Sequence, residues 1–383
     1  MYRYFIFYLS VLFLLSCNER DERKALSFQV KGSDTLFVCD LNRIEHEKVR
    51  INLSDWVDEF RWIQLDSADT ATIIGQEVYI TDNYIGMLDN QRFKLFNHAG
   101  QFLCDIGRVG QGPGEYTVLY SAALDEKRNR IYLAPFGHNK VWIYNFQGNS
   151  IEDMNMPLLT KGVIRSMSDG SLLMTHLNFG KSMQYFQIDT LGLKTFTSDM
   201  SKVVVTRTPS GDFIGYNNEI YLRNNTKDFI YHIYPSFSDS LFCFNPQSRK
   251  SYTRLTLNNL RSRYITITET PSAFFIRFIS GITNIPTKWI PTSEVIIADK
   301  KRETACFADI RNDYLGGIAV TSQFALPQSG WYYEVLEPIQ LLEMINNRLD
   351  EPDCTNEDKT RLKQLKNSFD KNGNNLLLYG KIR

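Results

Sequence analysis

Two segments of the chain, Phe93-Lys-Leu-Phe-Asn-His-Ala-Gly100 and Val141-Trp-Ile-Tyr-Asn-Phe-Gln-Gly148, share one pattern. Each is an alternating strand that ends in Asn, followed by two residues, a Gly and a second strand. Asn caps such a turn with its own side chain, and Gly accepts the positive φ that other residues resist. The pattern therefore predicts a β-hairpin that is repeated along the chain.

Further copies of this pattern extend over most of the sequence. A third copy ends at Gly192, and two more, at residues 241–248 and 295–302, fit the pattern without the Gly. Four strands in each unit of about 45–55 residues are typical of a β-propeller blade. We therefore predict an all-β, six-bladed β-propeller over residues 27–383. Residues 313–323, with strands from both termini, are expected to complete the sixth blade.

Residues 337–372 depart from the strand pattern. Pro338 suits the first turn of one helix, and Thr355-Asn-Glu-Asp358 is a capping box that opens a second helix. Residues 376–381 then read as a final strand. We expect a short helical insertion in the last blade, because two helices of this length bury little apolar surface by themselves.

The first 16 residues read as a signal peptide. Residues 4–15 are interrupted only by Ser10 and are shorter than the roughly 20 apolar residues of a spanning helix. The run ends at Leu14-Leu-Ser-Cys17, which resembles the lipobox of bacterial lipoproteins. This resemblance implies acylation of Cys17, with residues 17–26 as a tether. An ordinary signal peptide and a short membrane anchor are the alternatives.

A bacterial outer membrane location follows from the lipoprotein interpretation. Asn18 is not the Asp that often retains lipoproteins in the inner membrane. Acidic residues after Cys17 resemble surface-export signals, but Arg and Lys lie between them. The sequence therefore leaves open whether the protein faces the periplasm or the outside.

The most distinctive local motif is Ile106-Gly-Arg-Val-Gly-Gln-Gly-Pro-Gly-Glu-Tyr116. No Lys-Ser/Thr pair follows the glycines and Pro113 opposes an immediate helix, so a tight loop between two blades is favoured over a phosphate-binding loop. The segment closely resembles the "GxxGQGPGEY" signature of bacterial six-bladed β-propeller lipoproteins, which are related to NHL-repeat propellers. The resemblance implies a fold and an envelope location, and it brings no catalytic residues.

Six residues are candidate ligand contacts. Arg108, Gln111, Glu115 and Tyr116 are polar groups in a constrained loop, and loops at one face of a propeller are the default ligand surface. Trp331 and Tyr332 follow Gly330 in a less regular segment and are candidates for an exposed stacking platform. Packing between blades is the alternative for these two aromatic residues.

The sequence indicates no catalytic or metal-binding constellation and no cofactor. The five histidines are isolated, without HxH or HExxH spacing, and no GxSxG motif is present. We expect His98 and His138 to be solvated turn residues. Five cysteines remain beside Cys17, and their wide spacing predicts small buried side chains, with any disulfide pairing undetermined.

Composition narrows the function classes. Forty-three Lys and Arg residues balance 43 Asp and Glu residues, and this neutrality argues against nucleic-acid binding. We therefore predict an envelope-anchored, non-catalytic binding or scaffolding propeller for a glycan, peptide or protein partner. The alternative is a polysaccharide hydrolase or lyase with its site on one propeller face.

Overall fold

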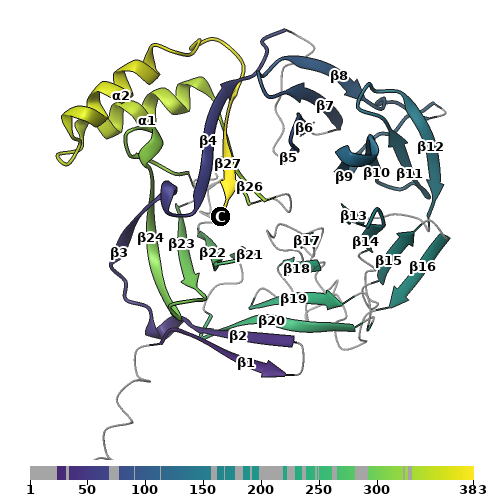
Figure 1. The fold of residues 1–383 in the computed structure, drawn as a ribbon, viewed down its shortest axis with the longest axis horizontal. Coiled ribbons are helices and arrows are strands. Elements are labelled where there is room, and N and C mark those ends of the chain that lie inside the picture. Colours follow the sequence, from purple (N-terminus) through teal and green to yellow (C-terminus); the bar gives the residue numbers. More distant parts are fainter. Residues whose placement is uncertain are drawn as a thin grey trace, which may run out of the picture.

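Six β-sheets stand around a common centre and form a closed ring (Figure 1). The predicted six-bladed β-propeller is confirmed. The computed structural model describes residues 24–31, 34–68, 77–89, 91–112, 114–156, 162–167, 169–176, 184–189, 192–197, 219–221, 229–234, 239–245, 248, 250–260, 265–280, 292–321, 324–326 and 330–383.

Blades 1 to 3 are four-stranded antiparallel sheets whose first strand lies nearest the centre (Figure 1). Blade 1 consists of β5 (Glu77–Ile80), β6 (Tyr84–Asp89), β7 (Arg92–Asn97) and β8 (Phe102–Ile106). Blade 2 consists of β9 (Leu119–Asp125), β10 (Arg130–Pro135), β11 (Lys140–Tyr144) and β12 (Ser150–Asn155). Blade 3 consists of β13 (Gly162–Ser166), β14 (Leu172–His176), β15 (Gln184–Asp189) and β16 (Gly192–Thr197).

Blades 4 and 5 repeat this order of strands. Blade 4 contains β17 (Glu219–Tyr221), β18 (Phe229–Tyr234), β19 (Ser240–Asn245) and β20 (Lys250–Asn258). Blade 5 contains β21 (Ile265–Glu269), β22 (Ala273–Ser280), β23 (Thr292–Asp299) and β24 (Thr304–Asn312). All five predicted hairpins are confirmed, and each joins the third and fourth strands of its blade.

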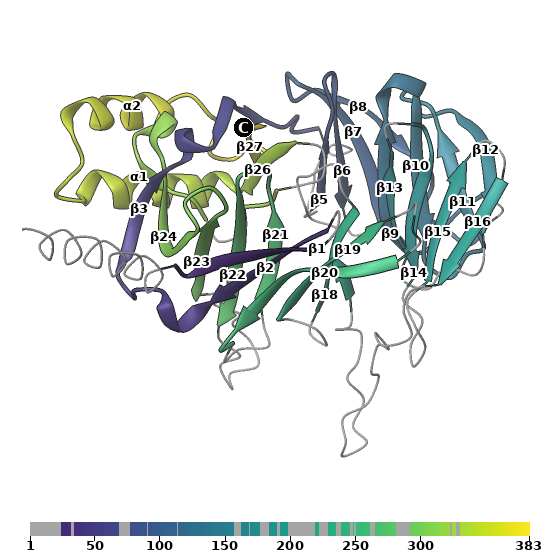
Figure 2. The same cartoon turned by 60° about the horizontal axis from the view of Figure 1, so that its bottom comes forward.

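The first described residues form a strap along the rim of three consecutive blades. The N-terminal strap consists of β1 (Leu26–Lys31), β2 (Asp34–Asp40), β3 (Lys48–Asn52) and β4 (Val57–Gln64). β2 pairs in parallel with β20 of blade 4 and carries β1 on its outer side, and β3 pairs in parallel with β24 of blade 5. Figure 2 shows β1 and β2 running beside β20.

Blade 6 closes the ring with both ends of the chain. Its order is β26 (Trp331–Leu336), β27 (Leu376–Ile382) and β4, so a strand of the N-terminal strap forms the rim. The prediction that both termini contribute is correct, but the predicted place of residues 313–321 is wrong, and residues 322 and 323 of that prediction lie outside the described residues. Gly316 and Gly317, with φ of 76° and 78°, turn the chain back so that β25 (Ile318–Ala319) pairs with β24 of blade 5.

Two helices, α1 (Pro338–Asp350) and α2 (Asn356–Lys366), lie between β26 and β27. Pro338 occupies the first turn of α1, and Thr355 caps α2 by accepting a 3.1 Å hydrogen bond from the Asp358 amide. The apolar sides of both helices are buried in one cluster with Leu376 and Leu378 of β27. The predicted pair of helices near the C-terminus is therefore confirmed.

Two of the repeated turns pack against the preceding blade, at Gly100 against β4 and at Gly148 against β8. The Asn97 side chain accepts hydrogen bonds from the amides of Ala99 and Gln101, at 2.9 and 3.1 Å. Gly100 has a φ of 81°, and a Cβ there would lie 2.3 Å from the carbonyl oxygen of Gln64 in β4. The Gly of the first predicted turn is thus required both by its backbone conformation and by the neighbouring blade.

Hydroxyl groups connect the innermost strands of consecutive blades. In each case an amide on the first strand of one blade donates to a hydroxyl on the first strand of the preceding blade. The pairs are Val78 to Tyr333 at 3.2 Å, Ala122 to Tyr79 at 3.3 Å and Ile164 to Ser121 at 3.2 Å. These bonds satisfy amides that face away from their own sheet, where an unpaired buried amide would be costly.

Candidate functional site

The loop that connects the rim of blade 1 to the innermost strand of blade 2 contains the glycine-rich motif. Its two sides are joined by hydrogen bonds from the Gly110 amide to the Tyr116 carbonyl, 2.9 Å, and from the Tyr116 amide to the Arg108 carbonyl, 3.0 Å. The Glu115 carboxylate accepts a 2.9 Å bond from the Gly112 amide. A Cβ on Gly110 would lie 2.0 Å from that carboxylate, so Glu115 and the glycines together fix the loop.

The four candidate residues of this loop have different environments. Arg108 and Gln111 are exposed, whereas Glu115 is half-buried and holds the loop. Tyr116 is buried, packs against Trp142 at a ring distance of 5.5 Å, and has its pKa raised by burial. The exposed part of the motif therefore includes Arg108 and Gln111, with Val109, 41% exposed, between them.

A second turn lies beside this loop. The Phe136 amide donates a 2.9 Å hydrogen bond to the Val118 carbonyl, and both side chains are exposed. We call the surface formed by Arg108, Val109, Gln111, Val118 and Phe136 the loop surface. It combines apolar contact area with a guanidinium and an amide, and apolar surface with a few polar groups is the usual composition of a ligand site.

Trp331 and Tyr332 do not form the expected exposed platform. They are only 8% and 0% exposed, because β26 is the innermost strand of blade 6 and its alternate residues face the two neighbouring blades. Trp331 packs near Tyr379, and the Tyr332 hydroxyl donates to Glu334. The interpretation of packing between blades is the one that the structure supports.

Glu334 is a buried carboxylate that is absent from the residues predicted from sequence. It lies on β26 and accepts hydrogen bonds from the amide and hydroxyl of Thr321, at 2.7 and 2.6 Å, as well as from Tyr332. Burial raises the pKa of Glu334. Alternation along the Trp331-Tyr-Tyr-Glu334 strand was the available signal, since it places Glu334 on the same side as the buried Tyr332.

His98 is also placed differently from the expectation. Its Nε2 lies 2.9 Å from the Thr81 carbonyl and its Nδ1 lies 2.9 Å from the Tyr379 hydroxyl. The half-buried ring thus joins blade 1 to blade 6, and the expectation of a solvated turn residue is wrong. His138 is half-buried, and its ring packs edge-on against Trp142 at 5.2 Å.

A buried ion triad joins blades 4 and 5. Glu269 is fully buried at the end of β21 and accepts hydrogen bonds from Arg254 at 2.9 to 3.1 Å and from Lys300 at 2.5 Å. The ring of Phe37, in the N-terminal strap, faces both cations, 5.3 Å from the Arg254 guanidinium and 5.8 Å from the Lys300 ammonium. Because both cations bind this carboxylate directly, the triad is a structural element of the blade junction.

A second charge network, the helical clamp, joins α1 and the α1–α2 connection to blade 5. Its members are Arg50, Asp309, Arg311, Arg348, Glu351 and Asp353. Arg348 is 5% exposed, binds Glu351 and Asp353 at 2.6 Å each, and donates to the Gly316 carbonyl at 3.1 Å. Hydrogen bonds from Arg50 and Arg348 lower the pKa of Asp353 to about 2.

Metal-binding side-chain clusters, membrane-spanning helices and disulfides were also considered. Within the described ranges, no group of three or more His, Cys, Asp or Glu side chains could hold a metal ion. In the same part of the chain, no helix is long and apolar enough to cross a membrane. The five described cysteines, Cys39, Cys104, Cys243, Cys306 and Cys354, form no disulfide, and burial raises the pKa of Cys39 to about 12. Cys17 and the predicted signal peptide lie outside the described residues.

A family model described as "Domain of unknown function (DUF4934)" matches residues 36–381, nearly the whole propeller. The chain belongs to the DUF4934 family. No curated protein matches its sequence. The resemblance to NHL-repeat propellers is a finer assignment than this match provides, and it stays a prediction.

Solved structures resemble the DUF4934 chain at low sequence identity. A Bacteroides fragilis protein, provisionally described as exported, superposes with a TM-score of 0.60 at 17% identity, covering 91% of this chain and 99% of its own. A member of the duf4221 family from Bacteroides vulgatus gives a TM-score of 0.44 at 11% identity, covering 86% and 97%. The first likeness shows a shared fold, and the second is too distant for any argument.

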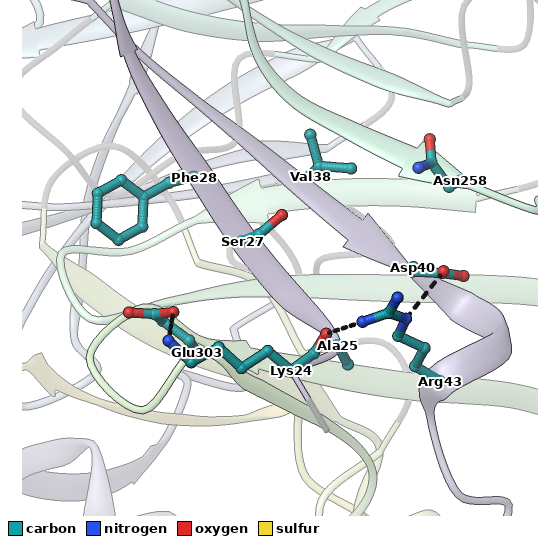
Figure 3. A pocket seen from close by; sticks show the side chains of 9 residues that line it. All are labelled: Lys24, Ala25, Ser27, Phe28, Val38, Asp40, Arg43, Asn258 and Glu303. Carbon is teal, nitrogen blue, oxygen red and sulfur yellow. Dashed lines mark hydrogen bonds and ion pairs between the residues drawn. The ribbon is translucent and has the colours of Figure 1, made fainter. Parts of the chain in front are cut away.

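The DUF4934 chain also has an open hollow at the beginning of the N-terminal strap (Figure 3). Its charged lining residues form pairs, Lys24 with Glu303 at 2.5 Å and Arg43 with Asp40 at 3.4 Å. The Arg43 guanidinium also donates to the Lys24 carbonyl. Phe28 borders the hollow, so a neutral polar surface lies next to an exposed aromatic ring.

Proposed function

We propose that this DUF4934 protein is an envelope-anchored lipoprotein that acts as a non-catalytic binding or scaffolding propeller for a glycan, peptide or protein partner. The observation that carries the proposal is the fixed loop surface beside blades 1 and 2. Arg108 and Gln111 are exposed there while Glu115 holds the backbone beneath them. A surface that is already ordered loses little conformational entropy when a partner binds.

The anchor is the second part of the proposal. Cys17 at the end of Leu14-Leu-Ser-Cys17 is the proposed lipidation site, and acyl chains on its thiol and its amine would hold the chain at a bilayer. The description of the Bacteroides fragilis neighbour as an exported protein supports a location outside the cytoplasm. We propose that the protein is located in the outer membrane. Experiment is needed to decide whether it faces the periplasm or the outside.

Ligand binding can be tested with a pair of matched double variants. Arg108→Ala/Gln111→Ala removes the polar groups of the loop surface, and Lys127→Ala/Gln147→Ala removes two exposed groups at the opposite end of blade 2. Thermal shifts are measured against glycans and peptides, where a ligand at a thousand times its Kd adds about 4 kcal/mol of stability. We expect a stabilising ligand whose effect only the first variant abolishes.

A photo-crosslinking residue at position 111 extends the test to protein partners in intact cells, with position 147 as the control. A partner crosslinked from position 111 alone supports the proposal. Release of product from a glycan in the panel would replace it with the hydrolase or lyase alternative. Equal crosslinking from both positions and a flat panel would contradict a role for the loop surface.

A further inference from the structure

The β1–β2 hairpin of the N-terminal strap exposes apolar side chains at the rim of blade 4. Phe28 and Val30 are 48% and 63% exposed, and both point to the same side of β1 because they are two residues apart. The Phe28 ring lies 5.9 Å from that of Phe37, which is buried and packs against Phe274 of blade 5. Phe37 lies directly opposite Phe28 on β2, so the exposed ring packs on one side against a buried aromatic side chain.

The short chain between the proposed anchor and this hairpin limits where the membrane can be. Lys24 is the seventh residue after Cys17, and a chain covers at most roughly 3.6 Å per residue. Whatever its conformation, this segment keeps Lys24 within about 25 Å of an acylated Cys17. The hollow and the β1–β2 hairpin, which begin at Lys24, therefore lie within reach of the bilayer. This step rests on the proposed anchor.

The charges around the hairpin suit a lipid surface. Lys24 and Arg43 line the same hollow as Phe28, and each is paired with a carboxylate, so the hollow is close to neutral. Phe28 and Val30, and not net charge, would then supply the contact with lipid.

We propose that the β1–β2 hairpin is the membrane-contacting surface of the anchored protein, with Phe28 and Val30 inserted at the lipid interface. In this orientation the rim of blade 4 faces the bilayer. Blade 1 lies across the ring from this rim, and the loop surface between blades 1 and 2 stays available for a partner (Figure 1).

Tryptophan quenching in the full-length lipidated protein tests this orientation. Phe28→Trp reports on the hairpin, and Leu103→Trp is the matched control, because Leu103 is 44% exposed on β8 of blade 1. Both variants are reconstituted in phosphatidylethanolamine and phosphatidylglycerol vesicles that contain a spin-labelled quencher lipid, and the wild-type signal is subtracted. We expect quenching at least about twofold stronger at position 28, since an inserted side chain lies within roughly 5–10 Å of the headgroup boundary.

Two further measurements on the same preparations separate the outcomes. The intact mass reports acylation of Cys17, and an unmodified Cys17 in a chain that leaves the vesicles contradicts the proposed anchor. An acylated chain with equal quenching at positions 28 and 103 overturns only the orientation. A chain that is dimeric in detergent, with the indole at position 28 already shielded there, also overturns it, because the hairpin then contacts a second copy. Equal thermal midpoints of both variants exclude misfolding.

Discussion

The two edges of blade 5 are held by charge networks that differ mainly in burial. The buried ion triad joins blade 5 to blade 4 through Glu269, which has no exposed surface. The helical clamp joins blade 5 to the two helices, and its carboxylates Glu351 and Asp353 are 32% and 43% exposed. The N-terminal strap contacts both networks: the ring of Phe37 on β2 faces the cations of the triad, and Arg50 on β3 belongs to the clamp.

This difference in burial decides what each network contributes. Removing one partner of a buried pair leaves an uncompensated charge, whereas exposed pairs are screened by water and salt. The triad should therefore be required for the junction between blades 4 and 5. The clamp should respond to pH and salt while the ring stays closed. Four predictions test this contrast, in order of decreasing effect.

Glu269→Ala is expected to have the largest effect. It leaves Arg254 and Lys300, with side chains 16% and 13% exposed, without their shared carboxylate. Such a change typically costs about 3–5 kcal/mol of unfolding free energy. Chemical denaturation measures the loss, and Glu269→Gln, which keeps the shape and part of the hydrogen bonding, should lose less. A loss below about 1 kcal/mol, the range of exposed pairs, would contradict the structural role of the triad.

Arg348→Ala is expected to lower the unfolding free energy by about 2 kcal/mol, within the range for hydrogen bonds to charged groups. The side chain is buried, and its loss removes the bonds to Glu351, Asp353 and the Gly316 carbonyl. Arg361→Ala, which removes an exposed pair with Glu357 on α2 and an exposed hydrogen bond to the Asp313 carbonyl, is the matched control and should cost less than Arg348→Ala, under about 1 kcal/mol. If the two variants lose the same unfolding free energy, Arg348 contributes no more to stability than an exposed ion pair does.

Acid should weaken the helical clamp. Asp353 has a folded pKa of about 2, below its usual value near 3.9. The folded pKa is depressed, so this stabilisation is complete above about pH 4 and is lost as the pH falls toward about 2. Glu351 acts in the same direction, because hydrogen bonds from Arg311 and Arg348 outweigh burial and lower its pKa.

Denaturation midpoints across this pH range measure the effect on the clamp. The Arg348→Ala variant should show a smaller acid-dependent change than the wild type, since both carboxylates lose a partner. An identical pH profile in the two proteins would show that the clamp does not cause the acid sensitivity.

Arg50→Ala is expected to have the smallest effect. Arg50 binds Asp353 from β3, but its side chain is 48% exposed. Exposed pairs contribute about 0.2–1 kcal/mol, and the loss should shrink further in 1 M salt, where the screening length is roughly 3 Å. The Glu269→Ala loss should persist in the same salt. A salt-independent loss for Arg50→Ala would remove the distinction between the two networks.

Much of the fold is accessible from the sequence because its signals are local. The Asn97 and Gly100 turn, and the Thr355 capping box, depend on residues within four positions of one another. The candidate site is only partly accessible. The sequence identifies the glycine-rich loop, but not that Glu115 holds its backbone while Arg108 and Gln111 face outward.

Positions whose partners are distant along the chain are harder to assign from sequence. Trp331 and Tyr332 are expected at the surface, yet β26 becomes an innermost strand because β27 and β4 pair outside it. His98 binds Tyr379, which lies 281 residues away. Residues 313–323 are expected in the sixth blade, but the reversal at Gly316 and Gly317 pairs Ile318–Ala319 with β24 of blade 5.

The repeating hairpin, the all-β class with two helices near the C-terminus and the neutral charge all follow from the amino-acid sequence alone, because turn chemistry and composition act over short distances. The folded ring was needed to show that the N-terminal strap covers three blades, and that Glu269 lies between two cations from different parts of the chain. The strap contacts and the burial of Glu269 both depend on which strands become neighbours in space. In a closed ring, the neighbours of each strand are fixed only when all six blades are in place.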